Sequence, residues 1–110
     1  MDTHEQIDRR SLLMAQAIAA RIDADPGRAG LAKAREVCRR WASKHQGPEP
    51  AVQEWTQILE QPWEAIRSVL LDDSEEGRRL RQSSPFCGIL TPQERWDIYR
   101  AFEADETRRT

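Results

Sequence analysis

Histidine and cysteine are scarce in this sequence, and this limits the chemistry that it can carry. Two histidines and two cysteines occur in 110 residues, and neither pair has the spacing of a metal site or a CxxC motif. Two thiols are also too few for the disulfide framework of a small secreted domain, so Cys38 and Cys87 are expected to be free. Cys87 lies among apolar residues, where a buried and inert thiol is favoured over a reactive one.

Long apolar runs are missing as well. No window approaches the roughly 18 uncharged apolar residues of a membrane span. The first residues are polar and acidic, where a signal peptide has a basic start and an apolar stretch. We therefore expect a soluble, cytoplasmic protein that does not associate with a membrane.

Catalytic and ligand-binding motifs are also absent. His4 and His45 have no evident catalytic partner, and His45 is better explained as a cation near a helix end, where the helix dipole favours it. Gly27 and Gly30 lack the Lys-Ser/Thr ending of a P-loop. The carboxylates of residues 72–76 lack the glycine and spacing of an EF-hand, and they suit the start of a helix. The sequence therefore predicts a protein that is not an enzyme and that uses no metal or cofactor.

Strand patterns are nearly absent, whereas helical spacing of apolar residues recurs throughout the chain. Proline, glycine and capping residues divide this pattern, and we expect a single all-α domain, a bundle of about six helices. They cover about residues 3–24, 28–45, 50–61, 62–71, 74–82 and 92–104, with a frayed tail at 105–110. The first two should form a long antiparallel hairpin across residues 25–27. Pro62 favours a new helix over a kinked continuation of the third, because proline removes a helical amide.

The start of the last helix is the most clearly marked feature of the sequence. Thr91 is a hydroxyl-bearing cap residue, Pro92 suits the first helical position, and Glu94 completes a capping box three residues after Thr91. The sequence therefore predicts a helix that begins at Thr91.

The segment before that helix is an uncharged apolar loop, residues 85–90, in which Pro85 and Gly88 argue against a continuous helix or strand. An uncharged apolar loop has to be buried, either in the core of its own chain or in a partner. The sequence leaves both destinations open.

Four tryptophans are spread over four of the expected helices, at positions 41, 55, 63 and 96. Large side chains distributed in this way typically fill a core made of short elements, so all four are expected in the core. Trp63 follows Pro62 at a helix start, and its alternative role is to anchor a partner.

The charges are distributed unevenly although the net charge is only -2. Residues 26–50 carry six basic and two acidic groups, residues 51–77 one basic and seven acidic, and residues 78–100 five basic and two acidic. This alternation favours solvated helix faces that pair with one another. A general nucleic-acid binder usually has a basic excess, so nucleic acid is the less favoured partner.

One segment resembles a known kind of protein. Ser84-Pro85-Phe86, Gly88, Leu90-Thr91-Pro92 and Glu94-Arg95-Trp96 resemble the C-terminal signature of small helical bacterial proteins that are encoded beside toxin genes, as antitoxins. The resemblance implies a bacterial cytoplasmic protein that binds and neutralises a toxin from a neighbouring gene. A common antitoxin plan joins a DNA-binding part to a long disordered segment. The short polar tail of this chain departs from that plan, which puts autoregulation at an operator in doubt.

The leading hypothesis is a non-enzymatic protein-interaction module, an antitoxin or a similar inhibitor, that docks through residues 78–96. Its apolar anchors would be Phe86, Ile89 and Leu90, with Trp63 as a further candidate. Its basic rim would consist of Arg78, Arg79, Arg81 and Arg95. The competing interpretation is that the loop folds back and closes its own bundle.

A different class of function is a helix-turn-helix DNA-binding regulator. The short helix with Arg78, Arg79 and Arg81 would then enter a major groove, but Glu75 and Glu76 at its start would repel phosphate. An enzyme ranks third. The oligomeric state stays open between a monomer and a homodimer.

Overall fold

The computed structural model describes residues 4–44 and 50–109, and all regular structure in this part of the chain is helical. The helices are α1 (His4–Asp23), α2 (Ala29–Lys44), α3 (Pro50–Ile58), α4 (Trp63–Leu70), α5 (Glu75–Arg81) and α6 (Pro92–Arg109). The prediction of a small all-α bundle is therefore confirmed. None of these helices is long and apolar enough to cross a membrane. The predicted end of the second helix, at His45, Gly47 and Pro48, lies outside the described residues.

Local sequence signals place most helix boundaries. Pro62 is the N-cap of α4 in an extended conformation, so the helix after it is a new one, as predicted. Ser74 is the N-cap of α5, and its hydroxyl accepts a hydrogen bond from the amide of Gly77. After α1, the carboxylate of Asp25 accepts hydrogen bonds from the amides of Gly27 and Ala29 and so caps the start of α2. These are bonds between near neighbours in sequence, and for this reason the sequence alone could place them.

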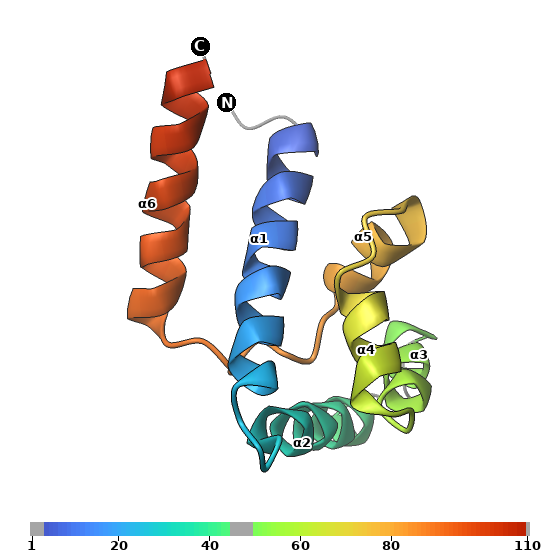
Figure 1. Ribbon diagram of the computed structural model, residues 1–110. Helices are drawn as coiled ribbons and strands as arrows, with labels where there is room; N and C mark the ends of the chain where they lie inside the picture. The colour runs from blue at the N-terminus through green and yellow to red at the C-terminus, as the bar shows by residue number, and fades with distance from the viewer. Residues whose placement is uncertain (1–3, 45–49, 110) are drawn as a thin grey trace.

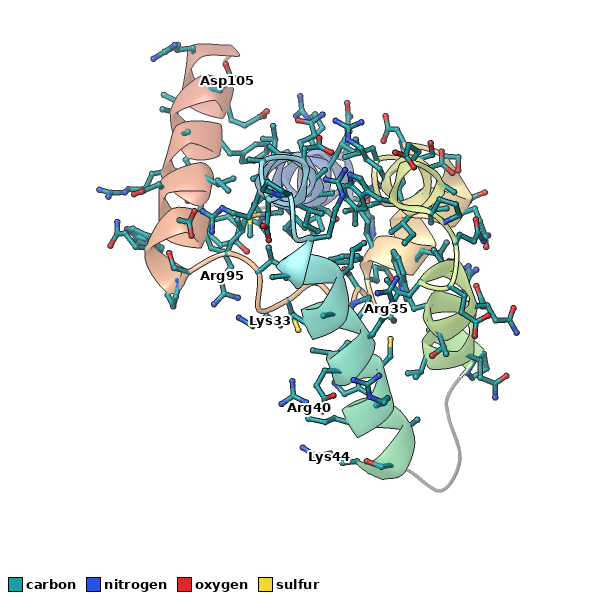
Figure 2. All side chains as sticks on the ribbon, turned by 60° about the horizontal axis from the view of Figure 1, so that its bottom comes forward. Lys33, Arg35, Arg40, Lys44, Arg95 and Asp105 are labelled. Atoms are coloured by element: carbon teal, nitrogen blue, oxygen red, sulfur yellow. The ribbon has the colours of Figure 1, made fainter. Side chains whose placement is uncertain are left out.

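The arrangement of α1 and α2 differs from the prediction. The antiparallel neighbour of α1 is α6, which lies alongside it in Figure 1, whereas α2 runs across the end of α1. The turn between α1 and α2 places Arg28 in the left-handed region, with φ of 51°, and this turns the chain away from α1. Helix α2 packs mainly on α3, where the guanidinium of Arg35 donates to the carbonyl oxygen of Leu59. Figure 2 shows the C-terminal half of α2 projecting from the body of the molecule.

The core lies where α1, α3, α4 and the loop after α5 converge. Its largest fully buried side chains include Ile22, Trp55, Leu59, Ile66 and Phe86. The indole N–H of Trp55 donates to the carbonyl oxygen of Leu80 at 2.9 Å, so the largest core residue leaves no buried donor unpaired.

Helix α6 is longer than predicted and continues to Arg109, so residues 105–109 are helical and not a frayed tail. Contacts with the start of α1 explain the extra turn. Glu106 forms an ion pair with Arg9 at 2.9 Å and accepts a hydrogen bond from Gln6. These partners lie about 100 residues away in sequence, and local propensity therefore could not indicate them.

Helix α6 is held on α1 by charged and aromatic groups as well as by apolar packing. The guanidinium of Arg9 lies 6.0 Å from the ring centre of Phe102, and that of Arg10 lies 5.0 Å from the ring centre of Tyr99. At the other end, Arg21 forms a close ion pair with Glu94. Helix α6 therefore lies at the edge of the bundle, and much of its surface faces away from the core.

The capping box at the start of α6 is present as predicted. The amide of Glu94 donates to the hydroxyl of Thr91 at 3.1 Å, and the amide of Thr91 donates to the carboxylate of Glu94 at 2.9 Å. Replacing Thr91 with alanine should lower the free energy of unfolding by about 1 kcal/mol through loss of this cap. Chemical denaturation measures the change, and an unaltered midpoint would contradict this role of Thr91.

A second stability test concerns Gly77 in α5. A methyl group on this residue would overlap the backbone carbonyl of Asp72, which cannot move aside as a flexible side chain could. Gly77→Ala should therefore destabilise the fold by about 1 to 3 kcal/mol. Gly88→Ala is the matched control, because a methyl group there meets no atom within 4 Å. Equal melting temperatures of the two variants would show that α5 does not pack as described.

Candidate functional site

The apolar loop before α6 is buried in its own chain. Phe86 is 1% exposed, and its ring meets that of Trp55 edge to face, with 5.8 Å between ring centres and 76° between ring planes. Leu90 is also buried in the same core. Of the two destinations that the sequence left open, the structure has the loop closing the bundle. This corrects the prediction of Phe86 and Leu90 as exposed anchors, because side chains already removed from water gain no further burial from a partner.

Ile89 is the partly exposed member of the predicted anchors. Its side chain packs against the core and lines a groove of about 620 Å³ between the end of α1 and the first half of α2. Arg21, Lys33 and Arg39 line the same groove. The groove is lined about equally by charged residues and by apolar or small ones, and Ile89 supplies part of its apolar lining.

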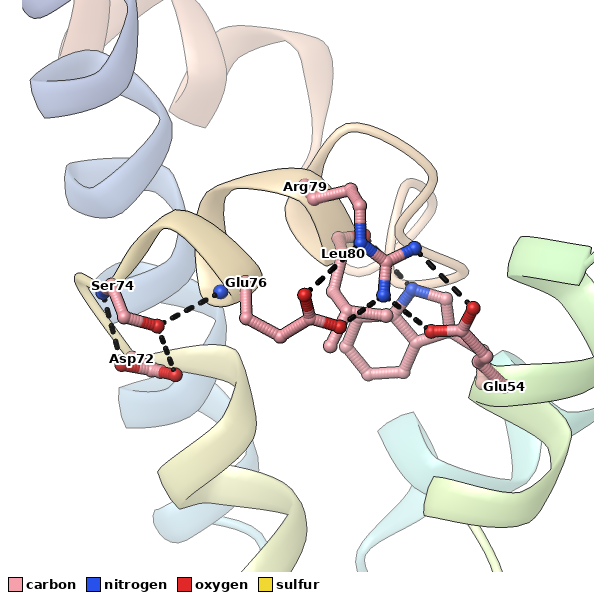
Figure 3. A network of polar contacts seen from close by, with 8 residues as sticks. Glu54, Asp72, Ser74, Glu76, Arg79 and Leu80 are labelled. Carbon is pink, nitrogen blue, oxygen red and sulfur yellow. Dashed lines mark hydrogen bonds and ion pairs between the residues drawn. The ribbon is translucent and has the colours of Figure 1, made fainter.

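Two of the predicted rim arginines form ion pairs within the chain. Arg79 binds the carboxylates of Glu54 and Glu76, as Figure 3 shows, and these bonds, first that with Glu76, raise its pKa. Arg78 lies 3.7 Å from a carboxylate oxygen of Asp8 and 3.6 Å from one of Asp73. Both guanidinium groups are engaged by carboxylates from two directions, which corrects their assignment to a free basic rim.

Arg81 is a structural residue. It is only 8% exposed, and its guanidinium donates to the carbonyl oxygens of Leu70 and Asp72 and to the hydroxyl of Ser11. Desolvation of this buried group lowers its pKa. Arg81 therefore fastens the connection between α4 and α5 to α1, and it is not available to a partner.

These contacts also affect the proposed DNA-reading role of α5. Gly77, Leu80 and Arg81 are buried, while Arg78 and Arg79 are held by carboxylates. A recognition helix needs free donors on its exposed face. In this fold the donors of Arg78, Arg79 and Arg81 are used within the chain. This corrects the prediction that these three arginines are the DNA-reading residues of a helix-turn-helix regulator.

The carboxylates of residues 72–76 act as local caps and ion-pair partners. Asp72 accepts hydrogen bonds from the hydroxyl and the amide of Ser74, and these bonds lower its pKa (Figure 3). Glu76 is bound by Arg79, which likewise lowers the pKa of Glu76. In the described part of the chain, no group of three or more potential metal ligands is assembled.

Trp63 is buried at the junction of α4 with the end of α1. It is 7% exposed, its indole N–H donates to the carboxylate of Asp23 at 2.7 Å, and the guanidinium of Arg28 lies over its ring. The hydrogen bond from Trp63 is the main cause of the lowered pKa of Asp23. Trp63 is therefore a core residue, as first expected, and its alternative role as an exposed anchor is corrected.

Trp96 has the opposite outcome. It was expected in the core but is 57% exposed. Trp96, Tyr99 and Phe102 follow one another at three-residue intervals, and each such step drifts by about 60° around a helix. The stripe that contacts α1 includes the buried Phe102, so Trp96 lies about 120° away from it and points outward. The drift is present in the sequence and shows that the three rings cannot all face one neighbour, but spacing alone does not show which of them faces α1.

The exposed large apolar side chains among the described residues all lie on α1 and α6. They are Ile7, Leu13 and Trp96, and Trp96 is the largest and most exposed of them. Cys87 is exposed as well, which corrects the expectation of a buried thiol, whereas Cys38 is buried and its pKa is raised by desolvation.

Arg95 is the one residue of the predicted rim whose guanidinium has no partner in the described part of the chain. Figure 2 shows Arg95, Lys33, Arg40 and Lys44 along one side of α2 and the start of α6. We call these four residues the basic row. No ion pair joins a side chain of the row to a carboxylate among the described residues, although the charge of Arg40 acts on Glu36. In the same part of the chain, the one side-chain hydrogen bond of the row is a long one from Lys33 to the carbonyl oxygen of Gly88, at 3.4 Å. Arg35 lies on the other side of α2.

Comparisons of the chain with protein-family models, with curated proteins and with solved structures returned no match. The candidate surfaces therefore rest on the sequence and the geometry. They are the outward side of α6 with Trp96, and the basic row.

Phe86 and Trp96 should respond in opposite ways to truncation. Phe86→Ala should lower the free energy of unfolding by about 3 to 5 kcal/mol because it leaves a cavity beside Trp55. Trp96→Ala should change it by less than about 1 kcal/mol, because most of that ring is already in water. Thermal and chemical denaturation of both variants measures the difference, and a stable Phe86→Ala variant would show that the loop is not part of the core.

Proposed function

We propose that the protein is a non-enzymatic interaction module, an antitoxin-like protein of the bacterial cytoplasm that binds and neutralises a toxin or enzyme encoded beside it. The observation that carries the proposal is the exposure of Trp96 on an 18-residue helix. Tryptophan is among the residues most enriched at binding hot spots, where burial of its ring supplies much of the binding free energy.

The surroundings of Trp96 support a docking role. Arg95, the preceding residue, has an unpaired guanidinium within the described structure, and arginine is also enriched at hot spots. Both residues belong to the segment that resembles the antitoxin signature. A partner with an apolar pocket beside a carboxylate would match this pair of side chains.

The fold presents α6 in a suitable way. The capping box and the buried loop fix the start of the helix, and the contacts of Arg9 and Arg10 hold its far end against α1. The outward side of α6 is then held in place before a partner arrives, which lowers the entropy cost of binding. In this proposal the apolar loop supports the docking helix from inside and does not itself touch the partner.

Trp96→Ala should weaken binding to the product of the neighbouring gene by about 30-fold or more, since truncation of a hot-spot residue costs at least about 2 kcal/mol. The measurement is calorimetric titration, together with rescue of growth when both proteins are expressed in one cell. Gln57→Ala, an exposed change on α3, is the control and should bind and rescue like the natural chain.

Three outcomes would contradict the proposal in different ways. Full binding by a folded Trp96→Ala variant would remove α6 from the interface. Failure of the natural chain to bind or to rescue would remove the antitoxin function. A concentration-dependent increase in mass that Trp96→Ala abolishes would instead assign the ring to a homodimer.

A further inference from the structure

We propose that the basic row, Lys33, Arg40, Lys44 and Arg95, binds the phosphate backbone of double-stranded nucleic acid. This surface shares Arg95 with the proposed docking side of α6, but its other three cations lie on α2 and do not depend on the proposed toxin partner. It also differs from α5, the helix on which the sequence had suggested DNA contacts.

The spacing of the row follows from helix geometry. Lys33, Arg40 and Lys44 are seven and four residues apart, so their side chains leave α2 within about 40° of one another. Along the axis they span about 16 Å at 1.5 Å per residue. Arg95 extends the row onto the start of α6 (Figure 2). A duplex carries about one negative charge per 1.7 Å of its axis, so a row of this length faces several phosphates.

The charges of the row are not neutralised within the described structure. Several other arginines that are partly exposed differ from the row in this respect, because Arg21, Arg67 and Arg79 each form an ion pair with a carboxylate. Glu36 is the carboxylate on α2 nearest in sequence to Lys33. It is bound by Arg39 at 2.6 Å, and its pKa is lowered first by Arg39 and also by the charge of Arg40. A phosphate backbone approaching the row therefore meets four cations that form no ion pair within the described structure, with the carboxylate of Glu36 near Arg40 already bound by Arg39.

The chemistry of α2 favours phosphate over a protein partner. A protein interface needs an apolar or aromatic centre within its polar rim. The exposed large apolar side chains of the described chain lie on α1 and α6, while the exposed positions of α2 hold charged residues, alanine and serine. Trp41 on α2 was expected in the core but is partly exposed, and it is the one large aromatic residue of that helix. The second half of α2 also projects from the body (Figure 2), and a projecting helix can enter a major groove about 12 Å wide.

The test uses the full-length protein and a fluorescent 25-base-pair duplex of mixed sequence, with anisotropy measured across a range of KCl concentrations. Binding should weaken on the order of 100-fold between 50 and 200 mM salt, as expected for about four phosphate contacts. The triple variant Lys33→Gln, Arg40→Gln, Lys44→Gln should bind at least about 10-fold more weakly and reduce the logarithmic salt slope by about 2.7.

The matched control removes three positive charges elsewhere, with Arg67→Gln, Arg100→Gln and Arg108→Gln. This variant should retain most of the affinity and the salt slope. Circular dichroism and melting curves establish that each variant is folded. If the triple variant proves unstable, the single Arg40→Glu variant replaces it and should weaken binding more than Arg108→Glu does.

Several results would overturn the inference. They are no binding of the duplex at 50 mM salt, equal losses in the triple variant and the matched control, or tighter binding of polyglutamate than of the duplex, which would assign the row to an acidic protein. Trp96→Ala is expected to bind the duplex normally, and the triple variant is expected to bind the neighbouring gene's product normally. Failure of one proposal therefore leaves the other testable.

Discussion

The contact between Trp55 and Phe86 is the constraint on which the rest of the structure depends. Both side chains are almost fully buried, and the indole N–H of Trp55 also binds the backbone at Leu80. This one cluster joins α3, the end of α5 and the loop that leads into α6. Because Phe86 and Leu90 complete the core, these two side chains are unavailable to a partner, and the proposed docking surface lies on α6 instead.

The arginines of α5 are also engaged by contacts within the chain. Arg81 is buried against backbone carbonyls and Ser11, and Arg78 is bound by Asp8 of α1 and by Asp73. Arg79 is bound by Glu54 of α3 and by Glu76 (Figure 3). A buried guanidinium without such acceptors would be strongly destabilising. The region that is richest in arginine is therefore structural, while the cations without side-chain ion pairs in the described chain include Lys33, Arg40 and Lys44 on α2 and Arg95 and Arg108 on α6.

The two candidate surfaces differ in chemistry because they lie on helices that are attached differently. Helix α6 is fixed at its start by the capping box and along α1 by Arg9, Arg10 and Glu106, so it presents an ordered aromatic side chain to solvent. Helix α2 packs on α3 with one side and projects with its C-terminal half, and its exposed positions hold mainly cations. The proposed protein-docking side of α6 and the basic row therefore differ in chemistry, and they share only Arg95.

The sequence by itself determined the helical class and most of the helix boundaries. Pro62, Ser74 and Thr91 act on amides within four residues of themselves, and such local bonds form whatever the rest of the chain does. Only the tertiary structure decided that the apolar loop closes its own core, that α1 pairs with α6, that residues 105–109 are helical, and that Trp96 is exposed. Each of these outcomes depends on a contact between residues distant in sequence or on the direction in which a helix face points. Composition and spacing do not determine which distant groups come into contact.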